Sequence, residues 1–334
     1  MNRIFALGLG LSLALAAVAL PLAAEAQVTL KMASNAHRAD PPKVGDQIAF
    51  EWLAEELEKR TDGAVALEIY WGGSLGAEAQ LHQSLATGVI DVLPNSGSNL
   101  ANLVPEIGLL STSYLFRDFD HYRAVVNDPA FFGRLQEIVR DHELGSQLVG
   151  MGATGSRNLY NRQREVRSPE DAAGMKMRVM SSPIEFRVWQ GLGMLPTNLP
   201  STEIYMSLQT GVVDASESSI PFIVSNKYYE VAPYITLTNH QISTHLYLMN
   251  DATIAALPDE HRETVLALFR EAGNRQIDAT KRLSSEMLEQ LRGNPNVTIT
   301  DVDTQPFADK LTSLQDDVAE ELGVDDLLTV IRAH

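Results

Sequence analysis

Residues 72–76 form a G-x-S-x-G pattern, which in hydrolases presents a nucleophilic serine on a sharp turn. The pattern lies between 65–69, whose alternation predicts a strand, and a segment expected to be helical, as such a turn requires. Later histidines, including His240 and His245, could complete a triad with Ser74. No His-Gly-Gly segment for an oxyanion hole precedes the turn. A glycine-rich surface turn is therefore the simpler interpretation, and a Ser74 hydrolase is the alternative.

Residue types that bind metals or redox cofactors are scarce. The chain has no cysteine, which excludes disulfides, thiolate zinc sites, iron–sulfur clusters and a cysteine nucleophile. His240 and His245 are five residues apart, so on a strand they point to opposite faces and do not share a metal. Neither a P-loop nor a G-x-G-x-x-G segment is present. We therefore expect no metal and no cofactor.

Two arginines stand where an anion could be held. Along 175–179 apolar residues alternate with cations, which predicts a strand with Arg178 on the face opposite to the methionines, near the strand's end. Arg157 follows 152–156, which we expect to be a loop leaving another strand. Ligands of α/β proteins collect at strand ends, and a guanidinium grips a carboxylate through two parallel hydrogen bonds. From spacing alone, a surface or salt-bridged arginine is the simpler interpretation, and a carboxylate-binding arginine is the alternative.

Composition narrows the possible partners. The chain has 334 residues, and 26 Lys and Arg against 43 Asp and Glu give a net charge of -17. So acidic a protein is unsuited to nucleic acid or an anionic membrane. The length exceeds what one small core usually organises, so we expect two lobes.

The first 26 residues have the pattern of a secretory signal peptide. Arg3 precedes an apolar run, 4–22, and Ala24-Glu25-Ala26 fits the small-x-small cleavage rule. A membrane anchor helix is the alternative, but Pro21 and the cleavage pattern favour removal before Gln27. No later stretch is apolar enough to span a membrane. We expect an exported protein, free in the periplasm.

The elements that must position the arginines alternate between strand and helix, which predicts an α/β fold. A helical pattern from Pro258 to about Arg292 is long enough to brace two lobes. Ser201 is placed to cap a helix that ends before Gly211. The remaining strands are expected at 28–32, 65–69, 89–92, 147–153 and 175–179, and the remaining helices at 48–60 and 78–87.

One internal repeat supports two similar lobes. Residues 84–91 and 207–214 are identical at six of eight positions, and both read as a helix, a glycine stop and a strand. A chance likeness of two common units is the alternative. Two lobes imply a ligand cleft between them. We expect lobe I over 27–150, with later chain returning to it, lobe II over 151–250, and C-terminal helices across both over 251–334.

Several segments together resemble the solute-binding proteins of TRAP transporters. Residues 174–179 resemble the family's G-x-K-x-R-V strand, and 200–214 resemble a second long motif. Shorter matches lie at 114–116, 229–231 and 238–240, and Leu75-Gly76 matches a loop of the family. The resemblance covers essentially the whole chain after the signal segment, in order.

This resemblance implies a two-lobed carrier that captures an organic acid in the periplasm and delivers it to an ion-driven membrane permease. Arg178 stands at the family's central carboxylate-binding arginine, and Arg157 at a second arginine that often helps. Ser218 replaces the asparagine that usually contacts the ligand. Ser201 replaces an aromatic residue that stacks on the ligand of sialic-acid binders, so a smaller sugar acid, hydroxy acid or dicarboxylate is expected.

Three further residues are expected to contact the ligand. Asn198 is a polar candidate from lobe II, and Asn35 and His37, just past the first strand, are candidates from the other lobe. The resemblance implies a binding protein rather than an enzyme, and a monomer. A sensor protein that passes its ligand to a receptor remains an alternative to transport.

Overall fold

The computed structural model describes residues 27–76 and 78–334. The predicted signal segment, 1–26, lies outside the described residues. In the described part of the chain, no helix is both long enough and apolar enough to cross a membrane.

A single nine-stranded sheet runs through the molecule in the order β2-β1-β3-β8-β4-β7-β5-β6, with β9 paired to β8. β1 is parallel to β2 and β3, and β5 is parallel to β6 and β7. The strands are β1 Val28–Ala33, β2 Val65–Tyr70, β3 Val92–Ser96, β4 Ser146–Asn161, β5 Lys176–Val179, β6 Leu195–Asn198, β7 Ala215–Ser219, β8 Tyr234–Asn250 and β9 Thr298–Asp301. The two parallel triplets define a β1–β3 unit and a β5–β7 unit.

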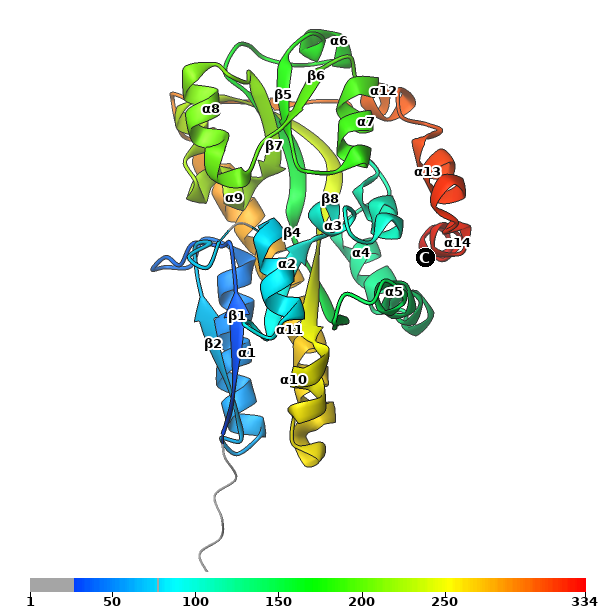
Figure 1. Cartoon of the computed structure of the whole chain (residues 1–334). Helices are drawn as coiled ribbons and strands as arrows, with labels where there is room; N and C mark the ends of the chain where they lie inside the picture. The colour runs from blue at the N-terminus through cyan, green and yellow to red at the C-terminus, as the bar shows by residue number, and fades with distance from the viewer. Residues whose placement is uncertain (1–26, 77) are drawn as a thin grey trace, which may run out of the picture.

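Two long antiparallel strands join these units. β4 has 16 residues and β8 has 17, and they pair along most of their length. One end of β8 pairs with β3, and β4 pairs with β7. Figure 1 shows β4 and β8 running from the β1–β3 unit at the bottom into the β5–β7 unit at the top. The chain therefore passes between the units more than once, as expected for a two-lobed α/β protein.

Helices cover the sheet of each unit. The longer ones are α1 Gly45–Arg60, α2 Glu78–Ala86, α4 Phe119–Val126, α5 Pro129–Asp141, α7 Pro183–Gly191, α8 Ile204–Thr210, α11 Asp259–Arg292, α13 Leu314–Leu322 and α14 Asp325–Ala333. Shorter ones are α3 Gly97–Leu100, α6 Pro169–Ala172, α9 Ile220–Ser225, α10 Asp251–Ala256 and α12 Gln305–Asp309. Three 3-10 turns are η1 Pro105–Ser111, η2 Ser201–Glu203 and η3 Tyr228–Glu230.

The predicted long helix is confirmed as α11, of 34 residues, which packs against α1, α9 and β4. Its approach to β4 requires glycine, because a Cβ at Gly273 would lie 2.0 Å from the carbonyl oxygen of Met151. α11 contributes buried residues to the apolar clusters of both units, for example Phe269 in one and Leu283 in the other. The helix thus braces the two units.

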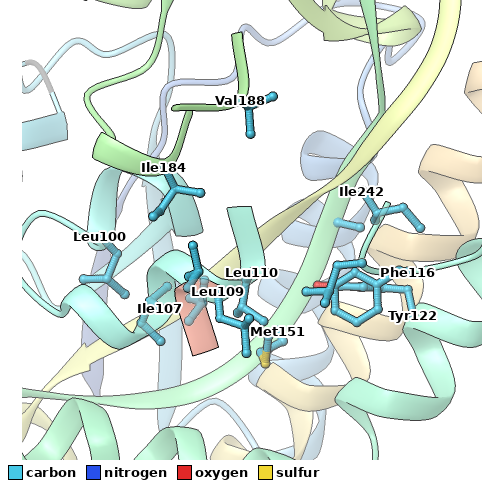
Figure 2. Close-up of a cluster of buried hydrophobic side chains, with 14 of the residues drawn as sticks. Leu100, Ile107, Leu109, Leu110, Phe116, Tyr122, Met151, Ile184, Val188 and Ile242 are labelled. Carbon is cyan, nitrogen blue, oxygen red and sulfur yellow. The ribbon is translucent and has the colours of Figure 1, made fainter. Parts of the chain in front are cut away.

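A third apolar cluster links the units directly. It contains Leu93 of β3 and Met177 of β5. Figure 2 shows part of it, with Ile184 of α7 above Leu109 of η1 and Val188 farther along α7. The two units share one continuous apolar core at this side.

The internal repeat predicted from the sequence has a common geometry in the two units. The backbone N–H of Lys31 donates to Asp91 Oδ2 at 2.8 Å, and that of Lys176 donates to Asp214 Oδ2 at 3.0 Å. The backbone N–H of each aspartate donates back to the same lysine's carbonyl, at 2.9 and 2.8 Å. Each aspartate therefore fixes the start of a strand beside its parallel neighbour.

Three local predictions were wrong. β3 starts at Val92 rather than at 89, because Asp91 first closes this bridge to Lys31. β4 extends to Asn161, past the end predicted at 153, because it pairs with β8 and β7 over that length. Ser201 caps no helix with its side chain; it opens the turn η2, and α8 begins at Ile204.

Candidate functional site

Arg178 is a buried cation without a carboxylate partner. It is the third residue of β5, between the buried Met177 and Val179, and only 5% of it is exposed. Its Nε donates to the carbonyl oxygen of Leu199, just past β6, at 2.9 Å. Among the residues that the structure describes, none places an Asp or Glu oxygen within 4.0 Å of its guanidinium. An anion entering here would find an unneutralised charge.

Burial lowers the pKa of Arg178, and the charge of Glu217 opposes that shift. An arginine starts so high that it stays protonated at neutral pH. Removing a charge from water without a partner costs several kcal/mol in typical cases. The arrangement is therefore suited to a ligand that supplies the missing carboxylate.

Arg157 lies inside β4, so its expected position in a loop was wrong. The glycine-rich stretch before it continues as strand because it pairs with β8. Its Nη2 donates to Glu217 Oε1 at 2.6 Å, its Nε pairs with the other carboxylate oxygen, and its Nη1 donates to Ser243 Oγ at 3.2 Å. Both side chains of the pair are buried. Its direct contact with ligand stays a prediction.

Glu217 is the carboxylate that pairs with Arg157 and lies beside the His240 ring. Burial alone would raise its pKa, but the charge of Arg157 and the nearby His240 ring lower it overall. His240 Nε2 lies 3.6 Å from Glu217 Oε2, and Thr238 Oγ1 lies 2.9 Å from the Nδ1 atom of His240. Burial lowers the pKa of His240, which favours the neutral ring. Glu217 thus neutralises Arg157 and leaves Arg178 as the unpaired cation.

The other residues expected from the β5–β7 unit lie along the same edge. Asn198 ends β6 and is exposed, and the next residue, Leu199, holds Arg178. Ser201 is exposed, and its carbonyl oxygen accepts from the Tyr228 hydroxyl at 3.4 Å. Ser218 lies in β7, nearly buried. Contact of these three side chains with a ligand stays a prediction.

Asn35 and His37 lie in the β1–β3 unit, past the end of β1. Both side chains are exposed. The Asn35 amide donates to Glu78 Oε2 at 3.5 Å, and the His37 ring lies beside Gly72. They come from the opposite unit to Arg178, and their contact with a ligand stays a prediction.

Sequence reasoning missed Glu78, the first residue of α2. Its carboxylate accepts from the Ser96 backbone N–H at 2.8 Å and from the Asn99 amide at 2.6 Å. Removal from water raises the pKa of Glu78 to about 6, although these donors and the charge of Arg178 lower it. Arg178 belongs to the other unit, so this electrostatic effect on Glu78 acts between the two units. The sequence signal that could have identified Glu78 is its position just after Leu75-Gly76, which matches a loop of the family.

Sequence reasoning also missed Glu185, on the first turn of α7. Ser98 of α3 donates to its Oε1 at 2.9 Å, which joins the two units. Burial and the neighbouring Glu217 raise the pKa of Glu185 to about 7, against the charges of Arg157 and Arg178. A second bridge runs from the Asn102 amide to the carbonyl oxygen of Ser181.

The histidines and Ser74 form no catalytic or metal group in the described part of the chain. His245 Nδ1 lies 3.4 Å from Asp46 Oδ1 and 3.0 Å from Gln276 Nε2, far along β8 from His240. In that part, no three His, Asp or Glu side chains are grouped to hold a metal ion. Ser74 is exposed in the turn after β2, where its backbone N–H donates to Trp71 at 3.3 Å. No hydrogen bond within the described residues joins its hydroxyl to a histidine.

Two α/β units with an unpaired cation between flanking polar side chains define a protein that binds an anionic solute. Residues 36–322 match the family described as bacterial extracellular solute-binding protein, family 7 (DctP), and the chain belongs to it. Membership makes it a binding protein and rejects the Ser74 hydrolase.

Relatives and solved structures agree with this assignment. The chain is 32% identical to a solute-binding protein of a Sulfitobacter species, over 85% of both chains. It is 27% identical to the 2,3-diketo-L-gulonate-binding periplasmic protein of Escherichia coli K12, over 79% of this chain and 80% of that one. A TRAP periplasmic solute-binding protein from Sulfitobacter, solved with bound alpha-D-taluronate, superimposes with a TM-score of 0.84 at 29% identity. That match covers 91% of this chain and 97% of the other.

Proposed function

We propose that this TRAP-family binding protein captures a sugar acid, with Arg178 as the anchor of its carboxylate. The observation that carries the proposal is the buried Arg178 guanidinium, which has no acidic partner among the described residues. Arg157 is neutralised by Glu217, so it supports the site rather than supplying the free charge. A bidentate carboxylate would satisfy Arg178 in both charge and geometry.

Polar groups from both units surround this anchor and suit a polyhydroxy acid. Glu78, Asn35, Asn198 and Ser218 supply hydrogen-bond donors and acceptors for ligand hydroxyls. Two of the similar proteins bind such acids, 2,3-diketo-L-gulonate and alpha-D-taluronate. Ser201 stands where sialic-acid binders of this family have an aromatic residue. We therefore favour a sugar acid of six carbons or fewer over sialic acid.

The same proposal places the mature protein in the periplasm. The predicted signal peptide would be removed near Ala26 and Gln27, and the carrier would act as a monomer. After capture it would deliver the acid to the membrane subunits of a TRAP permease. The TRAP relatives favour transport over sensing.

A thermal-shift screen tests the ligand class. The panel is D-glucuronate, D-taluronate and 2,3-diketo-L-gulonate, with D-glucose as the matched sugar that lacks a carboxylate. A ligand at a hundred times its Kd adds about 2.7 kcal/mol, which raises Tm by several degrees. We expect at least one acid to do so and D-glucose not to. A folded protein that responds to none of the acids, or equally to D-glucose, would contradict the proposal.

A further inference from the structure

A groove of about 550 Å³ is lined by residues of both units and of α11. Its lining comes from α1, α9, η3 and α11, and from the segment 41–43 between β1 and α1. Figure 1 shows this segment just below α9. Small-molecule sites typically enclose about 300–1,000 Å³, so the groove has the size of a ligand site.

The floor of the groove is apolar. It is made by Ile48 of α1, Val224 of α9, and Leu283 and Met287 of α11. Leu283 and Met287 belong to the buried cluster of the β5–β7 unit, and Ile48 and Val224 pack against that cluster. An aliphatic or aromatic group that binds here would therefore bury its apolar surface away from water.

The rim of the groove is positive, in a chain whose net charge is -17. Lys43, Lys227 and Arg282 line it, against one carboxylate, Glu286. Glu286 is already paired with Arg282 at 3.0 Å, and Lys227 lies 4.0 Å from Glu230. Lys43 has no hydrogen bond or ion pair with any residue in 27–76 or 78–334. The groove thus presents a free ammonium above an apolar floor.

We propose that this groove is a second ligand site, which takes an amphiphilic anion: a carboxylate or sulfonate attached to an apolar body. The apolar body would cover Ile48, Leu283 and Met287. The anionic group would pair with Lys43 and share Arg282 with Glu286. None of the residues that line the groove belongs to the candidate sugar-acid site. The two sites can therefore be separated by substitution.

Anilinonaphthalene sulfonate is a suitable probe, because it combines a sulfonate with an aromatic body and fluoresces when it leaves water. We expect the folded protein to bind it with one dominant site. Lys43→Gln and Arg282→Gln should each weaken that affinity about fivefold, the loss expected for one charge pair at a partly exposed position. Lys281→Gln is the matched control on α11, because Lys281 pairs with Asp120 outside the groove.

Two further measurements identify the site that the dye occupies and the chemical groups that the site prefers. Arg178→Ala should leave the dye affinity unchanged, and decanoate should displace the dye at a lower concentration than the uncharged decanol. Dye binding that is lost in Arg178→Ala and kept in Lys43→Gln would place the dye in the sugar-acid site and overturn the proposal. The proposal would also be overturned if decanol displaced the dye as well as decanoate does. It would be overturned too if Lys281→Gln weakened dye binding as much as Lys43→Gln.

Discussion

At the scale of single residues, two buried arginines of one sheet have opposite surroundings. Arg157 makes an ion pair with Glu217 at the centre of the sheet. Within the described residues, the Arg178 guanidinium donates only to the backbone carbonyl of Leu199. Breaking a buried pair costs about 3–5 kcal/mol, because one charge is left alone. The proposed anchoring of a carboxylate by Arg178 therefore requires Glu217 to stay paired with Arg157.

Glu185 gives a residue-scale prediction about pH. Its pKa is raised to about 7 in the folded protein, whereas a carboxyl group in an unfolded chain titrates near its ordinary 4.5. Between these values the folded state holds the extra proton, so this group makes stability fall as pH rises toward 7, with no further change above it. Glu185→Gln removes this pH-dependent loss of stability, and its side-chain amide oxygen can still accept a hydrogen bond from the Ser98 hydroxyl. We expect the variant to be more stable than the parent at pH 8.

Urea unfolding at pH 5 and pH 8 measures this effect. The stability difference between Glu185→Gln and the parent should be larger at pH 8 than at pH 5. The exposed Glu137→Gln on α5 serves as the control, with no such change expected. A difference for Glu185→Gln that is constant with pH would show that Glu185 does not titrate in this range.

The sequence indicated Arg178 but not the partners that decide its role. Its strand and its position in the family's motif follow from residues 174–179, whereas its burial does not. Glu217 is 60 residues from Arg157, and only the pairing of β4 with β7 brings them together. Glu78 and Glu185 likewise act through contacts with distant segments. Ion pairs between segments that are far apart in the sequence leave no local pattern from which they could be predicted.

At the scale of elements, the repeat of helix, glycine and aspartate builds the same bridge in both units. Gly88 and Gly211 have positive φ, 72° and 76°, and each lets the chain turn toward its aspartate. The local sequence was enough to predict the helix and the glycine that ends it, because both lie within eight residues. It did not predict the bridges to Lys31 and Lys176, which lie 60 and 38 residues from their aspartates. It was not enough to predict where β3 or β4 would end, because strand ends depend on partners elsewhere in the sheet.

Alanine at either glycine should have a similar cost. The left-handed backbone disfavours a Cβ by about 1–2 kcal/mol. A Cβ at Gly88 meets nothing within 4 Å, and one at Gly211 meets only the end of the Arg162 side chain, which can move. We expect Gly88→Ala and Gly211→Ala each to lower the free energy of unfolding by about 1–2 kcal/mol. A loss at Gly211 several times larger would show that its surroundings, rather than its φ, govern that turn.

At the scale of the whole molecule, the two units are joined by β4, β8 and α11, and they touch through the bridges at Ser98 and Asn102. We expect a hinge motion about these three elements, during which the apolar cluster that contains Leu93 and Met177 would repack between the units. A ligand that contacts both units favours the closed arrangement. The α/β class and the long helix were predictable from the sequence, whereas the position of each unit relative to the other depends on these long-range contacts.

Small-angle X-ray scattering tests this motion. Once the sugar acid is identified, saturating amounts should reduce the radius of gyration, and the same concentration of D-glucose should leave it unchanged. A radius that stays constant at saturation would indicate a rigid site.

Calorimetric titration of Arg178 variants with the identified acid tests the central claim most directly. Arg178→Ala leaves a buried carboxylate unpaired, which typically costs about 2–5 kcal/mol, so affinity should fall more than about thirtyfold. Arg178→Lys keeps the charge but loses the planar fork, so affinity should fall clearly but less. The exposed Arg167→Ala is the matched control and should bind like the parent. Circular dichroism should show all three variants folded. If Arg178→Ala binds within threefold of the parent, Arg178 is not the anchor and the account of the site is wrong.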